Sequence, residues 1–137
     1  MNALDSHISG ISNRTILIID DDPLVMQIAR AIIEKIGYHV LEAATGEEAI
    51  NITASHAGAI DLVILDLILP DIKAMDLFLR LREYRPNMKV LITSGYNQDK
   101  IIEEILISGA VGFIQKPYSF KLLESKLKEL LGSHHEP

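Results

Sequence analysis

From residue 14 onward, short apolar runs alternate with longer amphipathic segments, and this alternation constrains the fold more than any other feature. The apolar runs are TILIID, YHVLEA, DLVILDLILPD, KVLITS and VGFIQ. Runs of this length and composition are typical of buried strands, and the segments that follow them have the apolar spacing of helices. Five strands that alternate with five helices predict an α/β fold, with a parallel sheet covered on both faces.

Local signals mark where several helices begin and end. Asp22 is a suitable N-cap before Pro23, which occupies a favoured first helical position, and Gly37 ends that helix. Thr45 and Glu48 form a capping box for the next helix. Further helices are expected over residues 73–84, 98–108 and 119–131, the last of them capped by Ser119. The predicted buried stripe of the first helix is Leu24, Ile28, Ala31, Ile32 and Ile36.

Composition indicates one globular domain. The chain has 137 residues, of which 48% are hydrophobic and 23% are charged, and this balance suits a single folded core. We therefore predict one doubly wound (βα)5 domain over residues 14–131, with tails at 1–13 and 132–137. At this size the commonest arrangement is a flavodoxin-like five-stranded sheet in the order 2-1-3-4-5.

The same composition argues against several functions. A net charge of −6 does not suit direct binding of nucleic acid, which requires a basic surface. No apolar run approaches the roughly 18 residues of a membrane span, so membrane insertion is not expected. The absence of cysteine excludes disulfides and thiolate chemistry and fits a cytoplasmic location. The five histidines have no metal-ligand spacing.

The third apolar run contains one charged residue that needs an explanation. We interpret Leu62–Leu69 as a strand, and Asp66 interrupts it. An ionised carboxylate inside or at the rim of such a strand costs several kcal/mol unless it is paired. Polar groups at the carboxyl ends of parallel strands meet at one edge of the sheet. We therefore expect Asp66 to lie near the polar residues at the ends of the other strands, which are Asp20, Asp21, Asp22, Thr93, Ser94 and Lys116.

This set of side chains favours phosphoryl transfer. Converging carboxylates repel one another, and a divalent cation such as Mg²⁺, which prefers oxygen ligands, would remove the repulsion. Lys116 would supply a second positive charge. A carboxylate beside a metal ion, an ammonium group and a hydroxyl is equipped to attack a phosphoryl group, and the product would be an aspartyl phosphate.

Four blocks of the sequence resemble response-regulator receiver domains of the CheY type. The blocks are ILIIDDD followed by Pro23, LVILDLILP, VLITSGY and GFIQKPYS, in the order and spacing of that family, and the resemblance spans about residues 14–131. It implies that Asp66 is the phosphoacceptor. It also implies Mg²⁺, or Mn²⁺ in its place, bound directly by Asp21, Asp66 and the backbone carbonyl of Ile68, and through water by Asp20.

The resemblance further implies a switching protein rather than an enzyme with a separate substrate. A histidine kinase or histidine phosphotransfer protein would donate the phosphoryl group. Ser94 matches the switch hydroxyl and Phe113 the aromatic switch residue, and the Lys116–Pro117 peptide bond is expected to be cis. Phosphorylation would change the face built from residues 98–108, 111–115 and 119–131. That face would act on a partner or an output domain, or form a phosphorylation-dependent dimer.

Some residues depart from the family pattern. Lys73 and Ala74 stand where the family often has Asp-Gly. Ile68 and Tyr96 are expected to flank the path of an attacking water molecule and so to slow hydrolysis of the aspartyl phosphate. Faster hydrolysis in a Tyr96→Ala variant would support this role. The helix over 98–108 also has more apolar residues than one buried face requires, which suggests a partner surface.

Two other functions are compatible with parts of the sequence. Haloacid-dehalogenase-like phosphatases place a nucleophilic Asp and a second Asp two residues later, as Asp20 and Asp22 stand here, but this reading leaves Asp66 unexplained. It also requires an acidic pair after Lys116, where only helical Glu124 and Glu129 follow. The other alternative is a receiver-like module that acts by protein contact without phosphorylation.

Overall fold

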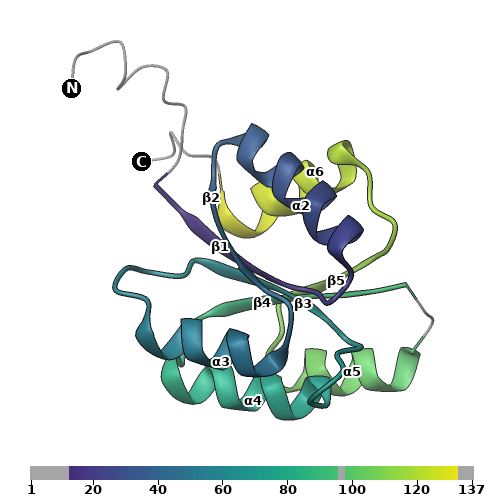
Figure 1. The fold of residues 1–137 in the computed structure, drawn as a ribbon. Helices are drawn as coiled ribbons and strands as arrows, with labels where there is room; N and C mark the ends of the chain where they lie inside the picture. Colours follow the sequence, from purple (N-terminus) through teal and green to yellow (C-terminus); the bar gives the residue numbers. More distant parts are fainter. Residues whose placement is uncertain (1–12, 96–97, 133–137) are drawn as a thin grey trace.

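Strands and helices alternate along the chain as predicted (Figure 1). The computed structural model describes residues 13–95 and 98–132. Its strands form one parallel sheet in the order β2-β1-β3-β4-β5, which confirms the α/β fold and the strand order. The elements are β1 (Thr15–Ile19), α2 (Pro23–Ile36), β2 (His39–Ala43), α3 (Gly46–Ser55), β3 (Leu62–Asp66), α4 (Ala74–Tyr84), β4 (Lys89–Ser94), α5 (Asp99–Ile107), β5 (Gly112–Gln115) and α6 (Phe120–Leu131).

Helices cover both faces of the sheet and create two core layers. Helices α2 and α6 lie on one face, and α3, α4 and α5 lie on the other (Figure 1). Successive side chains of a strand point to opposite faces. In β3, Leu62 and Ile64 therefore pack toward α2 and α6, whereas Val63 and Leu65 pack into the other layer. This two-sided burial explains why the strands are continuous apolar runs.

The predicted N-caps form, although Glu48 accepts its hydrogen bond from the Ala44 N–H and not from the Thr45 N–H of a capping box. The side chains of Asp22, Thr45 and Ser119 each accept a hydrogen bond from a backbone N–H in the first turn of the helix that follows. Such caps satisfy amide groups that have no partner within the helix. Gly37 ends α2 with a φ of 115°, a left-handed conformation that favours glycine.

The third strand is shorter than predicted, because β3 ends at Asp66 rather than Leu69. The Leu67 N–H still donates to the carbonyl of Thr93 at 2.9 Å, but the chain then turns, and Ile68 pairs with Lys73 in an isolated antiparallel bridge. Leu67 is buried and Leu69 packs against the core even though neither belongs to the strand. The apolar run was therefore longer than the strand it contained.

The predicted stripe of α2 is wrong for three of its five residues. Leu24 and Ile28 are 63% and 47% exposed, and Ala31 is exposed as well. Apolar residues cover a broad arc of this helix, so periodicity allows two overlapping stripes and does not decide which one faces the sheet. The buried residues of α2 are Met26, Ala29 and Ile33, against which Ile32 and Ile36 complete the packing.

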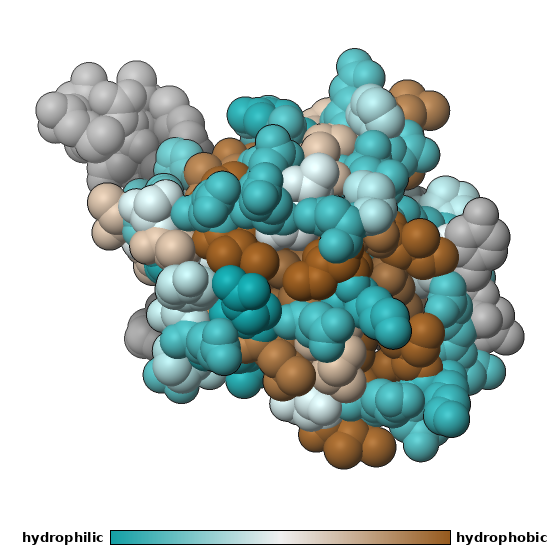
Figure 2. Space-filling model, turned by 60° about the horizontal axis from the view of Figure 1, so that its bottom comes forward, coloured by the Kyte–Doolittle hydropathy of each residue, from teal (hydrophilic) through white to brown (hydrophobic). Residues whose placement is uncertain are grey.

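Hydrophobic side chains also reach the protein surface on the side of the sheet that α3, α4 and α5 cover. Figure 2 shows them between hydrophilic residues on the side toward which α3, α4 and α5 lie. In α5, Ile101 is 40% exposed and Ile107 is 79% exposed, and Ile105 is the buried residue of the helix. None of the helices within residues 13–95 and 98–132 has the length and apolar character needed to cross a lipid bilayer.

Arg85, at the end of α4, binds the end of α3 through three hydrogen bonds. Its guanidinium group donates to the carbonyl oxygens of Thr53 at 2.8 Å, His56 at 2.7 Å and Gly58 at 2.9 Å. We expect Arg85→Ala to lower the free energy of unfolding by about 2 kcal/mol, because hydrogen bonds to a charged donor contribute more than neutral ones. Urea denaturation would measure the loss.

Arg80 provides a matched control on the same helix. Its ion pair with Glu83 is 3.6 Å long and exposed to solvent, so Arg80→Ala should change the stability by less than about 0.5 kcal/mol. Equal losses in the two variants would show that the contacts of Arg85 add nothing beyond those of a surface charge.

Candidate functional site

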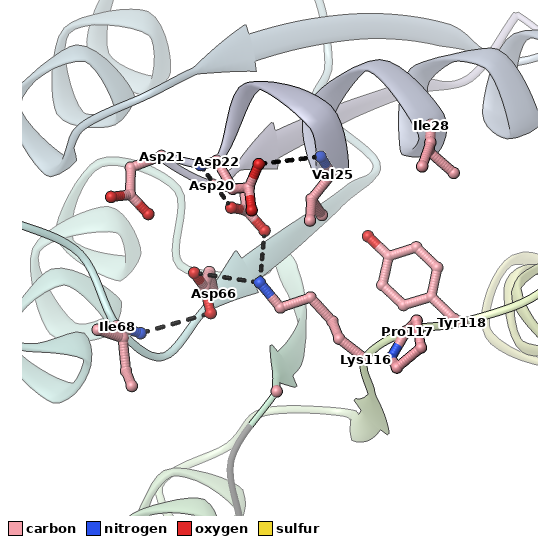
Figure 3. A pocket seen from close by; sticks show the side chains of 11 residues that line it. Asp20, Asp21, Asp22, Val25, Ile28, Asp66, Ile68, Lys116, Pro117 and Tyr118 are labelled. Atoms are coloured by element: carbon pink, nitrogen blue, oxygen red, sulfur yellow. Dashed lines mark hydrogen bonds and ion pairs between the residues drawn. The ribbon is translucent and has the colours of Figure 1, made fainter.

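The carboxyl edge of the sheet brings together charged residues that are far apart in the sequence. Asp66 is the last residue of β3, Asp20 directly follows β1, and Lys116 directly follows β5. β1 and β3 are hydrogen-bonded neighbours, with Ile19 opposite Leu65, so Asp20 and Asp66 leave adjacent strands at the same level. Figure 3 shows Lys116 reaching across from the β5 side to both carboxylates.

These three side chains form a buried ion-pair cluster. The Nζ atom of Lys116 lies 2.9 Å from Oδ2 of Asp20 and 3.4 Å from Oδ2 of Asp66. The side chains of Asp20 and Asp66 are only 3% and 5% exposed. The remaining carboxylate oxygens face backbone amides: the Asp22 N–H donates to Oδ1 of Asp20 at 2.9 Å, and the Ile68 N–H donates to Oδ1 of Asp66 at 3.5 Å.

One ammonium group does not fully compensate both carboxylates. Burial raises the pKa of the Asp66 carboxyl and the charge of Asp20 raises it further, although Lys116 and the Ile68 N–H oppose the shift. Burial acts to lower the pKa of Lys116, but its hydrogen bond to Asp20 and the charge of Asp66 outweigh this, and that pKa is raised. The lysine is therefore charged, and ionised Asp66 still lacks compensating positive charge.

Asp21 extends the cluster toward solvent. One carboxylate oxygen from each of Asp20, Asp21 and Asp66 lies within 4.8 Å of the others, and Asp21 is exposed. Ligands of an octahedral Mg²⁺ ion lie roughly 2.1 Å from the metal, so opposite ligands are about 4.2 Å apart. The oxygen atoms of this cluster are close enough together to surround a small divalent cation after a small adjustment, and such a cation would compensate the charge of Asp66.

The cluster forms one wall of an open pocket of about 610 Å³ (Figure 3). Asp20, Asp21, Asp22, Asp66 and Lys116 supply its charged wall, and Gly95 supplies backbone. The rest of the lining is mainly apolar. Sequence reasoning named Ile68 and Pro117 but missed Val25 and Ile28 of α2, which belong to no motif. It also gave no role to Tyr118, although this residue lies in the block GFIQKPYS. The apolar lining consists of Val25, Ile28, Ile68, Pro117 and Tyr118.

The other predicted site residues lie around the cluster or outside it. Ser94 is fully buried at the end of β4, and its carbonyl accepts a hydrogen bond from the Lys116 N–H at 2.9 Å. Phe113 is half-buried on β5 and packs against the core layer of α3, α4 and α5. The Lys116–Pro117 peptide bond is cis. Tyr96 lies outside the described residues.

Comparison with known proteins decides the family. Residues 16–128, most of the chain, match the response regulator receiver domain. The chain belongs to this family. Similar proteins include the sensor kinase CckA of Brucella abortus (strain 2308), which is 32% identical over 117 residues. That alignment covers 85% of this chain and 12% of CckA.

Solved receiver domains have the same fold. The CheY-like receiver domain protein of Methanospirillum hungatei JF-1 is 31% identical, with a TM-score of 0.81 over 90% of this chain and 98% of that one. CheY of Borrelia burgdorferi, in the CheX–CheY–BeF3–Mg²⁺ complex, is 27% identical, with a TM-score of 0.80 over 90% and 92% of the two chains. The chain spans only part of the length of its curated relatives, from 12% to 56% of each of the first four.

The geometry of this receiver domain does not suit the phosphatase alternative. That reading requires Asp22 as a second acid, but Oδ1 of Asp22 accepts hydrogen bonds from the N–H groups of Leu24 and Val25 as the cap of α2. The later acids, Glu124 and Glu129, lie on α6 and pair with lysines of the same helix. The function of a receiver domain in a two-component system is favoured instead.

Proposed function

We propose that this protein accepts a phosphoryl group on Asp66 and acts as a phosphorylation-controlled switch in the cytoplasm. The observation that carries the proposal is the cluster in which Lys116 pairs with Asp20 and Asp66 while Asp21 adds a third converging carboxylate. The functional unit is proposed to be residues 14–131, with tails at either end. The donor is a histidine kinase or a histidine phosphotransfer protein.

In this reaction a carboxylate oxygen of Asp66 forms a bond to phosphorus as the bond from phosphorus to the donor imidazole nitrogen breaks. The imidazole keeps the electron pair of the broken bond. Lys116 lies beside the same carboxylate and would stabilise the charge of the incoming phosphoryl oxygens. The Ser94 hydroxyl is proposed to donate to one of those oxygens after phosphorylation.

The proposed metal is Mg²⁺, with Mn²⁺ as a substitute. Asp21, Asp66 and the backbone carbonyl of Ile68 would hold it directly, and Asp20 would do so through water. When bound, it supplies positive charge that offsets the negative charge of the transferring phosphoryl group. The Borrelia burgdorferi CheY, which shares this fold, was solved in a complex that contains BeF3 and Mg²⁺, and this supports the assignment.

The proposed output is a change in the surface formed by α5, β5 and α6. Phosphorylation favours one of two conformations, in which Ser94 moves toward the phosphoryl group and Phe113 turns inward. The exposed Ile101 and Ile107 of α5 give this surface apolar contacts for a partner, an output domain or a second copy of the chain.

The test is intact-mass spectrometry after incubation with acetyl phosphate, with Mg²⁺ and with EDTA. We expect a gain of one phosphoryl group only when Mg²⁺ is present. Borohydride reduction, which converts an aspartyl phosphate to homoserine, followed by peptide mapping should place the modification at Asp66. If the protein neither gains mass nor binds beryllofluoride, the favoured function becomes that of a module that acts by protein contact without phosphorylation.

A further inference from the structure

The loop between β3 and α4 carries Ile68 and ends at a helix start that has no side-chain cap. The loop runs over residues 67–73 and leads into α4, whose N-cap is Lys73. Lys73 makes no capping hydrogen bond through its side chain. This is the place where the sequence departs from the Asp-Gly pattern of its family. Something else must hold the loop beside the acidic cluster.

Asp71 binds the loop to the beginning of α3, 25 residues earlier in the chain. Its Oδ1 atom accepts a hydrogen bond from the Gly46 N–H at 2.9 Å, and Oδ2 accepts one from the Glu47 N–H at 3.0 Å. Amides of a helix N-terminus attract a negative charge. The hydrogen bond from Gly46 is accordingly the main cause that lowers the pKa of the Asp71 carboxyl.

The loop also lies in direct contact with the helix. A Cβ atom added to Gly46 would collide with Cγ2 of Ile72. Glycine at this position therefore allows Ile72 to pack against the first turn of α3, next to the two hydrogen bonds of Asp71. The hydrogen bonds of Asp71 and the packing of Ile72 therefore both hold this part of the loop against α3.

A short path connects this contact to Asp66. Ile68 and Lys73 pair in an antiparallel bridge that closes the loop, with Asp71 inside it. The Ile68 N–H in turn donates to Oδ1 of Asp66. Fixing Asp71 on α3 therefore restricts the backbone of Ile68, whose carbonyl is the proposed metal ligand.

We propose that Asp71 is a positioning residue that holds the β3–α4 loop against α3, so that the Ile68 carbonyl faces the metal position beside Asp66. This inference rests on the proposed function. Asp71 takes no part in bond making. Its role is to keep a backbone ligand in place, as outer-shell partners of metal ligands do.

The test compares Asp71→Ala with Thr45→Ala. Oγ1 of Thr45 caps the same helix end by accepting from the Glu48 N–H at 3.1 Å, but it does not bind the loop. Both variants weaken the start of α3. We expect the Mg²⁺ dissociation constant, measured by calorimetry, to rise about 10-fold in Asp71→Ala and to stay unchanged in Thr45→Ala.

Phosphorylation by acetyl phosphate adds a second readout. In Asp71→Ala the rate should fall at low Mg²⁺ and recover when Mg²⁺ is saturating, because the defect lies in metal binding. Asp71→Asn, which keeps one acceptor oxygen, should give an intermediate Mg²⁺ affinity. The asparagine variant also keeps the inference testable if Asp71→Ala does not fold.

The outcomes separate this inference from the function on which it rests. If the wild type binds Mg²⁺ and Asp71→Ala binds it equally well, only the role of Asp71 is wrong. The same holds if Thr45→Ala loses as much affinity as Asp71→Ala, since helix capping alone would then explain the effect. A wild type that binds no Mg²⁺ would overturn both the inference and the proposed function.

Discussion

Replacing Asp66 with asparagine is expected to abolish the magnesium-dependent gain of a phosphoryl group. The side chain keeps its size, but a neutral amide cannot act as the nucleophile, and one ligand of the proposed metal site loses its charge. Intact-mass spectrometry with acetyl phosphate would compare this variant with the wild type. A gain that persists in the variant would mean that another carboxylate accepts the phosphoryl group.

The same substitution should stabilise the metal-free protein. The pKa of Asp66 is raised above its ordinary value of 3.8 in the folded state, so the folded protein binds this proton more tightly than the unfolded chain does. The stability that Asp66 contributes is therefore present below pH 3.8 and is lost as pH rises through the folded-state pKa. At pH 7 the neutral asparagine avoids that loss.

We expect Asp66→Asn to raise the free energy of unfolding by roughly 1 kcal/mol at pH 7 without Mg²⁺. Lys116 still has Asp20 as a partner at 2.9 Å, so no charge is left unpaired by the change. Added Mg²⁺ should raise the stability of the wild type more than that of the variant. A less stable metal-free variant would show that the ion pair with Lys116 outweighs burial and the repulsion from Asp20.

Lys116→Met should have the largest effect on stability. It leaves Asp20 and Asp66, which are almost fully buried, with no ammonium group between them. Removing one partner from a buried ion pair typically costs about 3–5 kcal/mol. We expect a loss of about 3 kcal/mol in urea denaturation without metal, and partial recovery with Mg²⁺, because a bound cation compensates the same two carboxylates.

A surface lysine serves as the control for that experiment. Lys128 is 59% exposed and pairs with Glu124 at 3.6 Å on α6, so Lys128→Met should cost no more than about 0.5 kcal/mol, whether or not Mg²⁺ is present. If Lys116→Met lost no more stability than this control, the carboxylates would have found compensation elsewhere, by taking up a proton or water.

Much of the fold and the charged cluster could be predicted, since both follow from local patterns and one topological rule. The carboxyl ends of parallel strands meet at one edge of the sheet. The proximity of Asp20, Asp66 and Lys116 could therefore be predicted without knowing any interatomic distance. The outward side of α2 could not be predicted in this way. Leu24 and Ile28 have the same helical spacing as the residues that are buried, and only the packing against the sheet distinguishes the two sets.

The contact between Asp71 and α3 was also beyond prediction. Asp71 lies in a loop, and its partners, Gly46 and Glu47, are 25 and 24 residues away, so no periodicity or spacing links them. A glycine directly after the N-cap Thr45 was the one local hint that another segment approaches this helix end. A hint of this kind shows that space is needed but does not identify the segment that fills it.

Asp66 also has a consequence for the alignment of the central strand. β3 lies between β1 and β4, and all five of its residues are buried. A slip of one residue along its neighbours would turn every side chain to the opposite layer. If the slip drew Asp66 into the sheet, it would also move the carboxylate away from Lys116 into hydrocarbon. Such a pairing is therefore penalised by the same charge that the proposed chemistry uses, so the proposed phosphoacceptor would also help to fix the register of the strand.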